Sequence, residues 1–429
     1  MGDRERAETQ SGNVSEPVGG EPGGAQSRIR LRRDGQQWEF DRVVKDTGRV
    51  FHFQPSGRGA LPPSVRMHAM ISKHVGKAAQ RLERLAGEEA AAGHDTTALD
   101  LYFDAATAYA EAQHTIFENN AEKRFLHGAS LRCYDEVRAR APYVIEHVDV
   151  PWEGTVVSGN LHLAPVERPA PCVFLIPGCD MTKEMVPHPH FNHALQRGMH
   201  VFVFDGPGQG ESNLRDIALT TDNYESAASA ALSHLLERPE IAADRVGVLA
   251  MSFGSYWGVR FAATDDRLAA AAFPWASICD KYYLMEEESP RYKQLFAYLT
   301  RSKSEDDLDA FVARMGLEQM MPEITCPTLL QVGEYDPRSP VDEVYQLYDS
   351  MQAPRELWVF ADQHHMATLR GPAGMAGLWN LDTYATSMDF LRDRFDGKPL
   401  AHDGGVLYIE PGSGPHSTSV PAKRRWFED

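Results

Sequence analysis

The sequence has few features of a secreted, membrane-bound or nucleic-acid-binding protein. Its five cysteines are scattered without a C-x-x-C pair, which argues against a disulfide framework and against a cysteine-based zinc site. The N-terminal stretch carries no apolar run of a signal peptide, and no run reaches the length of about 18 apolar residues that a bilayer span needs. We therefore expect a cytoplasmic protein with no membrane partner.

Positive charge is also scarce relative to negative charge. The 43 Lys and Arg residues stand against 61 Asp and Glu residues, a formal net charge of −18. Such a surface repels phosphate backbones, so we expect no nucleic-acid partner. With 42% hydrophobic residues in 429, the chain can bury a substantial core, and its length suits one large domain with additions.

Composition and periodicity divide the chain into four parts. Residues 1–27 are rich in Gly, Pro, Ser and Glu, which predicts a disordered tail. Residues 28–141 form a mainly helical cap segment, because from about residue 61 apolar residues recur at intervals of three and four. Residues 142–397 form a mixed α/β domain, and residues 398–429 are expected to be a loose tail.

The α/β domain begins with an alternating stretch that predicts a hairpin, with E-G and S-G as its turn signals. Apolar strands and helices then alternate, which is typical of a mostly parallel sheet covered by helices on both faces. The charged, helical stretch 279–322 interrupts this alternation and is expected to form a lid insertion.

The stretch VLAMSFGSYWG carries the first candidate catalytic residue, Ser252. A strand leads into it and a helix leads out, and a nucleophilic serine on such a tight turn needs small residues two positions before and after. Ala250 and Gly254 meet this need, so we interpret Ser252 as a nucleophile. The alternative is that it only caps a helix.

Two further strand ends supply an acid and a base. Asp336 follows the strand PTLLQVG, with Glu334 as an alternative acid, and His365 follows the strand RELWVFA, with His364 as an alternative base. The order Ser, Asp, His is that of a nucleophile, an orienting acid and a general base in one class of hydrolase.

The loop IPGCDMTKEM follows the strand expected beside that of Ser252. Backbone N–H groups of Cys179 or Asp180, together with that of Phe253, would bind the negative charge that develops on a carbonyl oxygen. Cys179 could itself be a thiol nucleophile, but no base is evident near it in the sequence.

Two other motifs suggest ligands without completing a site. His188, His190 and His193 have ligand-like spacing, but no cysteine or acid in the sequence completes the set. The stretch 206–212, GPGQGES, lacks the lysine of a P-loop, so a tight turn is the plainer interpretation. We expect neither a metal nor a cofactor.

With these residues assembled, the chain resembles the α/β-hydrolase superfamily from about residue 145 to 395. The motifs GCDMTKE (178–184) and DGPGQGE (205–211) and the helical N-terminal segment resemble one branch of it. That branch contains 2,6-dihydroxypseudooxynicotine hydrolase, fungal polyketide chain-shortening hydrolases and the fermentation-respiration-switch esterases. The chain differs from this branch at two places. It has Ala250 where the branch has Gly, and it has the pair His364–His365 where the branch tends to have an acid before the histidine.

The resemblance implies hydrolysis of a carbon–carbon bond beside a ketone, aided by an extra glutamate in the lid. Glu286 or Glu287 falls near the corresponding place, although an acidic run is also an ordinary solvated helix face. The resemblance also implies a homodimer through the N-terminal helices.

We therefore predict a serine hydrolase that acts on a carbonyl of a bulky aromatic or polyketide-type small molecule. Three alternatives stay open: a carboxylesterase or amidase, a biosynthetic cyclase or acyltransferase that reuses the triad, and a non-enzymatic binding protein. Aromatic side chains are expected to line the pocket, or else to belong to the core: Trp257, Trp275, Tyr282 and Tyr283.

Overall fold

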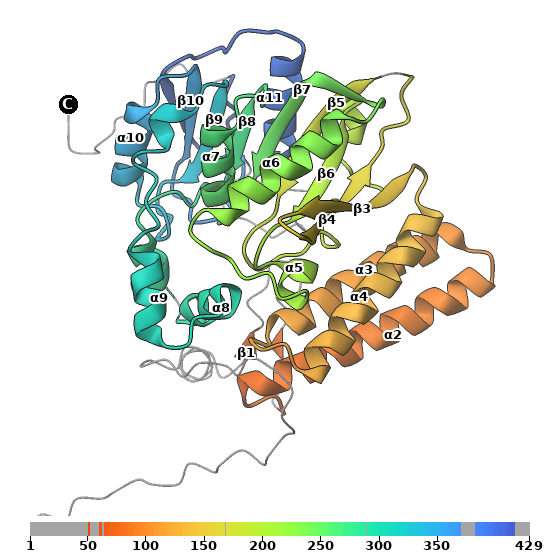
Figure 1. Cartoon of the computed structure of the whole chain (residues 1–429). Helices are drawn as coiled ribbons and strands as arrows, with labels where there is room; N and C mark the ends of the chain where they lie inside the picture. Colours follow the sequence, from red (N-terminus) through yellow and green to blue (C-terminus); the bar gives the residue numbers. More distant parts are fainter. Residues whose placement is uncertain are drawn as a thin grey trace, which may run out of the picture.

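The computed structural model describes residues 50–51, 60–61, 64–167, 169–288, 290–369 and 382–416 (Figure 1). The tail predicted over residues 1–27 lies outside the described residues. The short strands β1 (Val50–Phe51) and β2 (Ala60–Leu61) pair antiparallel near the N-terminal end of the described chain.

A nine-stranded sheet forms the centre of the described part of the molecule (Figure 1). Its strands from β11 to β6 are parallel. At one edge β4 pairs antiparallel with β6, and β3 pairs antiparallel with β4. This is the predicted mostly parallel sheet. In spatial order the strands are β11 (Gly405–Ile409), β10 (Arg355–Phe360), β9 (Thr328–Gly333), β8 (Ala271–Pro274), β7 (Ile241–Ala250), β5 (Ala170–Ile176), β6 (His200–Asp205), β4 (Thr155–His162) and β3 (Ile145–Trp152).

Helices cover both faces of this sheet and create two cores. On β5, Phe174 packs into the core under α6 (Asn223–Leu236), α7 (Gly254–Thr264) and α10 (Val341–Ser350), whereas its neighbour Leu175 packs into the core under α11 (Asp382–Phe395). Successive strand residues point to opposite faces, so a strand covered on both sides is apolar throughout. The continuous apolar run of this strand thus follows from its central place.

The predicted hairpin joins β3 to β4 through a turn at Glu153 and Gly154. Both residues have positive φ, 46° and 76°, the backbone twist that favours two-residue hairpin turns. The other expected turn signal, at Ser158 and Gly159, is wrong, since both residues lie within β4. A Cβ on Gly159 would lie 2.2 Å from the Phe202 ring, so this glycine allows close packing.

Three long helices precede the sheet: α2 (Ile71–Ala91), α3 (Asp95–His114) and α4 (Ala121–Arg140), with a short 3-10 turn η1 (His68–Met70) before them. Asn120 starts α4, because its side chain accepts a hydrogen bond of 2.8 Å from the Lys123 N–H. Figure 1 places these helices beside the short α5 (Gly210–Leu214), which follows β6. Ala110 of α3 shares a buried cluster with Met181, so the helical segment packs onto the loop after β5.

A second helical segment lies between β8 and β9, within the expected lid insertion. It consists of η3 (Tyr283–Glu287), α8 (Arg291–Thr300), α9 (Glu305–Val312) and η4 (Met321–Glu323). The Tyr298 hydroxyl of α8 donates a 2.7 Å hydrogen bond to Asn119, and Asn119 in turn donates to the Asn213 carbonyl. The two helical segments therefore meet over α5. A further short turn, η2 (Leu195–Arg197), precedes β6.

The C-terminal stretch differs from the expectation of a loose tail over residues 398–429. Residues 405–409 form β11, which pairs in parallel with β10 along its whole length, and Leu407 and Ile409 are buried. The sheet therefore extends beyond residue 397. The five-residue run GVLYI is too short for its periodicity to identify it as a strand.

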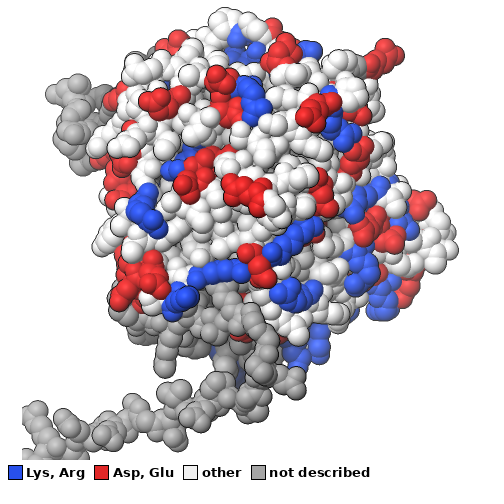
Figure 2. Space-filling model, in the orientation of Figure 1, with Lys and Arg blue, Asp and Glu red and all other residues white. Residues whose placement is uncertain are grey.

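None of the described helices combines the length and the apolar character that a bilayer crossing demands. On the face shown in Figure 2, acidic and basic side chains are interspersed.

The buried end of β11 provides a test of its place in the sheet. We expect Ile409→Ala to lower the free energy of unfolding by about 2–5 kcal/mol, because Ile409 is fully buried. The adjacent Glu410 is exposed, so Glu410→Ala should change stability by less than about 0.5 kcal/mol. Urea denaturation of both variants measures the difference, and equal stabilities would contradict the assignment.

Candidate active site

Ser252 lies in the turn between β7 and α7, with a φ of 55°. A non-glycine residue in this left-handed region is strained, and such strain persists only where the surroundings enforce it. Two hydrogen bonds do so here: the Ser252 N–H donates to the Pro274 carbonyl at 3.2 Å, and the Gly254 N–H donates to the Met251 carbonyl at 2.9 Å. The turn thus presents the serine hydroxyl at the carboxyl edge of the sheet.

The small residues around this turn are required by close approach of backbone segments. A Cβ on Gly254 would lie 2.5 Å from the Pro177 carbonyl oxygen. A Cβ on Gly258 would lie 2.5 Å from the methyl group of Ala250. Gly258 lies one turn further along α7 and has no side chain. It therefore leaves room for the methyl group of Ala250, at the position where a glycine is usual.

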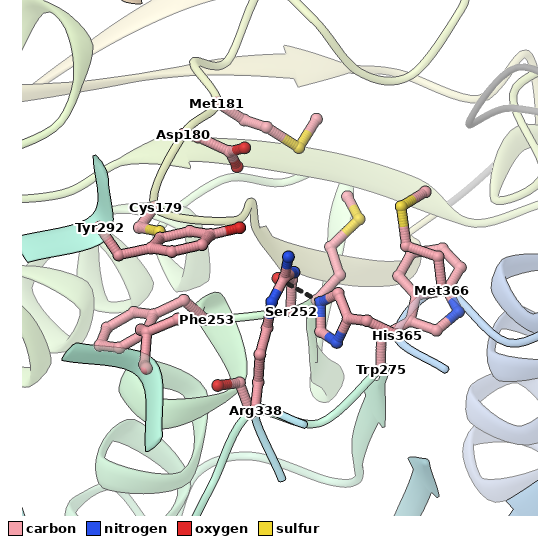
Figure 3. A pocket seen from close by; sticks show the side chains of 13 residues that line it. Cys179, Asp180, Met181, Ser252, Phe253, Trp275, Tyr292, Arg338, His365 and Met366 are labelled. Carbon is pink, nitrogen blue, oxygen red and sulfur yellow. Dashed lines mark hydrogen bonds between the residues drawn. The ribbon is translucent and has the colours of Figure 1, made fainter. Parts of the chain in front are cut away.

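Three of the predicted residues come together at this edge. Ser252 Oγ lies 2.8 Å from His365 Nε2 (Figure 3). On the other side of the imidazole, His365 Nδ1 lies 2.6 Å from Asp336 Oδ2. Burial works to raise the pKa of Asp336, but the contact with His365 outweighs it, so the pKa is lowered and the carboxylate stays charged. A charged, buried acid can orient the imidazole and stabilise its protonated form.

The alternative acid and base make other contacts. His364 Nδ1 lies 2.9 Å from the Tyr335 carbonyl oxygen, and its side chain is largely exposed. Glu334 accepts hydrogen bonds from the Asp362 N–H and from the Tyr408 hydroxyl. Geometry therefore favours His365 and Asp336.

The N–H groups expected to form an oxyanion hole lie on two neighbouring turns. Neither the Cys179 N–H nor the Phe253 N–H donates to the oxygen of another residue within the described ranges, and both residues line the pocket at Ser252. Gln209 fixes the first turn by donating a 3.0 Å hydrogen bond to the Gly178 carbonyl. Burial raises the pKa of the Cys179 thiol, which argues against its use as a nucleophile.

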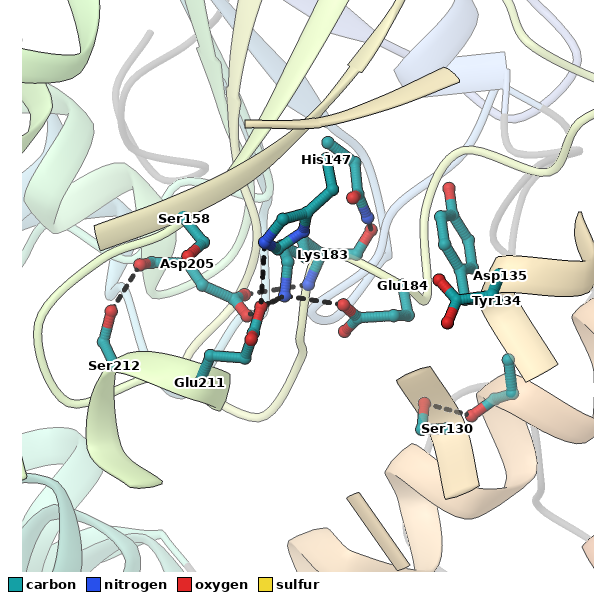
Figure 4. A network of polar contacts seen from close by, with 12 residues as sticks. Ser130, Tyr134, Asp135, His147, Ser158, Lys183, Glu184, Asp205, Glu211 and Ser212 are labelled. Atoms are coloured by element: carbon teal, nitrogen blue, oxygen red, sulfur yellow. Dashed lines mark hydrogen bonds and ion pairs between the residues drawn. The ribbon is translucent and has the colours of Figure 1, made fainter. Parts of the chain in front are cut away.

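A buried lysine connects the two motifs that carry the family resemblance (Figure 4). Lys183 Nζ lies 2.6 Å from Glu184, 3.3 Å from Asp205 and 2.5 Å from Glu211, and the Lys183 side chain is fully buried. The Lys183 N–H also donates to Asp205, and the Lys183 carbonyl accepts from Asn160. The predicted tight turn over residues 206–212 is thus also one side of this ion cluster.

One ammonium group among three carboxylates leaves an excess of negative charge. At Glu184, burial would raise the pKa, but Lys183 lowers it to about 2. At Asp205, burial and the neighbouring carboxylates outweigh Lys183, and the pKa rises to about 7. Burial and the neighbouring carboxylates thus favour the protonated form of Asp205, which limits the cost of burying so many acids.

The pocket at Ser252 is narrow, with a volume of about 40 Å³. Asp180 is the one carboxylate among the described residues that line it. The lining residues are Cys179, Asp180, Met181, Met251, Ser252, Phe253, Trp275, Ser277, Leu284, Tyr292, Arg338, His365 and Met366 (Figure 3). This space holds a few water molecules at most, so a bulky ligand needs more room than the pocket offers in this structure.

Most of the other predicted pocket residues lie elsewhere. Glu286 pairs with Lys293 and lines a second cavity of about 510 Å³ together with the exposed Tyr282. Glu287 and Tyr283 do not line the pocket at Ser252, as far as the described residues show. Trp257 is buried in the core, where it stacks on Tyr224 at 4.3 Å.

Trp275 reaches the site, as predicted for the pocket, and it also has a structural role. Its indole N–H donates a 2.9 Å hydrogen bond to the Ala367 carbonyl, which supports the loop that carries His365. Arg338 and Tyr292 were missed in the sequence. Arg338 stands only two residues after Asp336, a proximity that could have signalled it, whereas no local pattern marks Tyr292.

The histidine motif acquires an acid from a distant helix. Asp100 of α3 lies 2.8 Å from His190 Nδ1 and 3.7 Å from His188 Nε2, so the expectation that no acid completes the set is wrong. His193 instead packs against Tyr384. The His190 N–H donates to His188 Nδ1, and these contacts attach α3 to the loop before η2.

Comparisons with known proteins agree with the architecture. Residues 80–289 match a family model described as esterase FrsA-like, and residues 189–397 match that of the prolyl oligopeptidase family. A 2,6-dihydropseudooxynicotine hydrolase of Paenarthrobacter nicotinovorans is 28% identical over 272 residues, 63% of this chain and 72% of the relative. A 20-hydroxy-prefusarin hydrolase of Gibberella moniliformis is 30% identical over 45% of this chain and 48% of the relative, so the match spans about half of that protein.

A solved structure of 2,6-dihydroxy-pseudo-oxynicotine hydrolase superposes with a TM-score of 0.68 at 24% identity. The match covers 86% of this chain and 96% of the other. At this identity the likeness shows a shared fold. The predicted fold and the predicted resemblance are both confirmed.

The contact between Ala250 and Gly258 can be tested by exchange. We expect Gly258→Ala to destabilise the protein by about 1–3 kcal/mol, because the new methyl would overlap Ala250. The double variant with Ala250→Gly should recover part of this loss. As a control, Gly128 in α4 has no atom within 4 Å of a built Cβ, so Gly128→Ala should be neutral or stabilising by up to about 1 kcal/mol.

The ion cluster predicts a pH-dependent loss of stability in Lys183→Met. Without the ammonium group the buried carboxylates gain a raised pKa. The folded state of the protein is then favoured at low pH, and its stability falls as the pH rises through that pKa. We expect a loss of about 3–5 kcal/mol at pH 8 and a smaller one at pH 5. Lys398→Met, which removes an exposed lysine, is the control in urea denaturation, and a pH-independent loss would contradict the model.

Proposed function

We propose that the chain is a serine hydrolase acting on a carbonyl group, because it has the α/β-hydrolase fold and is similar to the 2,6-dihydropseudooxynicotine hydrolase and to the FrsA-like esterases. The observation that carries the proposal is the contact chain from Ser252 through His365 to Asp336, at 2.8 and 2.6 Å. His365 takes the proton of Ser252, and Oγ attacks the substrate carbonyl. The N–H groups of Phe253 and Cys179 stabilise the oxyanion.

Within this class we propose a carbon–carbon bond beside a ketone as the bond that breaks. The support is the resemblance to the pseudooxynicotine-type hydrolases and to the fungal relatives. The substrate is a small molecule with a bulky aromatic or polyketide-type acyl part, which the two helical segments would enclose after opening.

A carboxylesterase or amidase is the second candidate, and one observation favours it. Glu286 and Glu287 do not line the pocket at Ser252 within the described ranges, so neither is in place to protonate a carbon leaving group. An alkoxide or amine leaving group takes its proton from His365 and needs no additional acid.

The nucleophile is tested by labelling with a fluorophosphonate and by turnover of ethyl benzoate and 1-phenylbutane-1,3-dione. We expect Ser252→Ala to abolish labelling. We expect Asp336→Asn to lower turnover by about four orders of magnitude, because the imidazole loses its orienting charge. The controls His364→Ala and Glu334→Gln should stay within a few-fold of the wild type.

The two substrates separate the candidate functions. Cleavage of the diketone supports the carbon–carbon reaction, and cleavage of the ester alone supports the esterase. A product that has not gained the elements of water points to cyclisation or transfer. An unlabelled Ser252 in the folded wild type refutes the serine hydrolase.

A further inference from the structure

Arg338 brings a positive charge into the pocket of Ser252. It follows β9 on the loop that carries Asp336, and its side chain is 20% exposed. Its Nε is buried without a hydrogen-bond partner among the described residues, and Glu288 lies 3.8 Å away, beyond hydrogen-bond distance. The Arg338 guanidinium makes no side-chain hydrogen bond to the described residues and stands on the wall of the pocket, so its donors can receive a ligand.

Tyr292 of α8 stands against the same guanidinium. The Arg338 guanidinium carbon lies 5.0 Å from the centre of the Tyr292 ring, and both side chains line the pocket. Figure 3 shows the tyrosine hydroxyl directed across the pocket. Burial raises the pKa of this hydroxyl although Arg338 works to lower it, so the group stays a neutral hydrogen-bond donor.

The other charges around Arg338 are largely engaged. Asp336 accepts from the Arg338 N–H and contacts His365, and Glu288 approaches only Nε. Arg291 stacks on the same tyrosine ring at 4.7 Å but contacts His114 and does not line the pocket. Asp180 is the remaining carboxylate on the pocket wall. Arg338 is thus the one Lys or Arg side chain on the described wall of the pocket at Ser252.

We propose that Arg338 and the Tyr292 hydroxyl form a subsite for an anionic oxygen of the substrate, an enolate, phenolate or carboxylate oxygen next to the carbonyl that Ser252 attacks. The assignment rests on the proposed function for the reaction, but the binding of an anion there does not depend on it. In a pocket of about 40 Å³, an anion at Arg338 lies within a few atoms of Ser252. Charge-assisted hydrogen bonds at such a largely buried site are strong and directional.

The subsite has a direct use in carbon–carbon cleavage. Ser252 Oγ forms a bond to the carbonyl carbon, and its proton passes to His365. When the tetrahedral intermediate collapses, the electron pair of the broken carbon–carbon bond becomes that of an enolate, whose negative charge lies on oxygen. Arg338 stabilises that oxygen, and His365 returns the proton to the leaving carbon. Water then hydrolyses the acyl-enzyme. The pocket therefore needs no lid glutamate.

Binding is tested first, by calorimetry with benzoate and with its neutral counterpart benzamide. We expect the wild type to bind benzoate at least 10-fold more tightly, and Arg338→Gln to reduce this preference to within about 2-fold. Arg338→Lys, which keeps the charge without the planar fork, should be intermediate. Arg291→Gln is the matched control, because it removes the other arginine on Tyr292 and should keep the preference. A benzoate preference that survives in folded Arg338→Gln overturns the subsite, as does its absence in the wild type.

A second experiment distinguishes two roles of Arg338: binding of a ligand, and neutralisation of the charge on Asp180. If Arg338 only balances that carboxylate, the double variant Asp180→Asn with Arg338→Gln regains the preference for benzoate, and the proposal fails. If the preference stays lost, the guanidinium itself binds the anion. Thermal melting of each variant confirms that it is folded.

Turnover identifies the kind of oxygen that is bound. Three substrates share a benzoyl group: ethyl benzoate carries no acidic oxygen, 1-phenylbutane-1,3-dione carries an enol, and benzoylpyruvate carries both an enol and a carboxylate. We expect Arg338→Gln to lower kcat/KM at least 10-fold more for the diketone than for the ester. The loss lies in kcat if the developing enolate is bound, and an equal loss on all three substrates overturns the subsite. A loss confined to benzoylpyruvate and to its KM assigns the carboxylate.

Failure of the subsite and failure of the serine hydrolase are distinguishable. If Ser252 is not labelled by the fluorophosphonate but benzoate binding still depends on Arg338, the subsite stands and the proposed reaction falls. If labelling is normal and the benzoate preference is insensitive to Arg338, the reaction class stands and the subsite falls.

Discussion

The buried ammonium group of Lys183 is the interaction on which the geometry of the site depends. It joins the loop after β5, which carries Cys179, to the end of β6 and to α5. A lysine that is fully buried must be paired, and three carboxylates around it restrict the loop to one arrangement. Backbone N–H groups can stabilise an oxyanion only if they are fixed before the reaction, because reorganisation would consume the benefit. The ion cluster therefore supplies preorganisation to a loop that has no regular secondary structure.

A second constraint acts on the opposite side of the pocket, where strand, turn and helix meet at Ser252. Positive φ at the serine and the absence of a side chain at Gly254 and at Gly258 are parts of one steric arrangement. The alanine at 250 shows how such an arrangement tolerates a change: the extra methyl is accepted because the facing helix carries a glycine. Strain at Ser252 and the rigidity of the loop that carries Cys179 together place the serine hydroxyl against two ordered turns.

The charge beside Ser252 differs from the prediction of an extra glutamate supplied by the lid. The lid glutamate Glu286 is neutralised by Lys293, whereas a cation, Arg338, faces Ser252. Negative charge that develops on a leaving group is stabilised by a cation and opposed by an acid in its charged form. If the chain cleaves carbon–carbon bonds, the group that stabilises the leaving carbon is a cation and not a lid carboxylate. Near this pocket the two helical segments are joined by the hydrogen bond from Tyr298 to Asn119.

The sequence alone determined what depends on neighbouring residues: the apolar strands, the helices between them, the small residues around Ser252, and the position of Asp336 and His365 at strand ends. These follow from periodicity and local sterics, so one stretch of chain suffices to infer them. Only the tertiary structure decided the contacts between distant stretches. Examples are Asp100 beside two histidines, Lys183 between two motifs, β11 on the sheet edge, and Arg338 with Tyr292 in the pocket. The reason is physical, since these contacts depend on strand order, on register and on which helix covers which loop, and no local pattern records them.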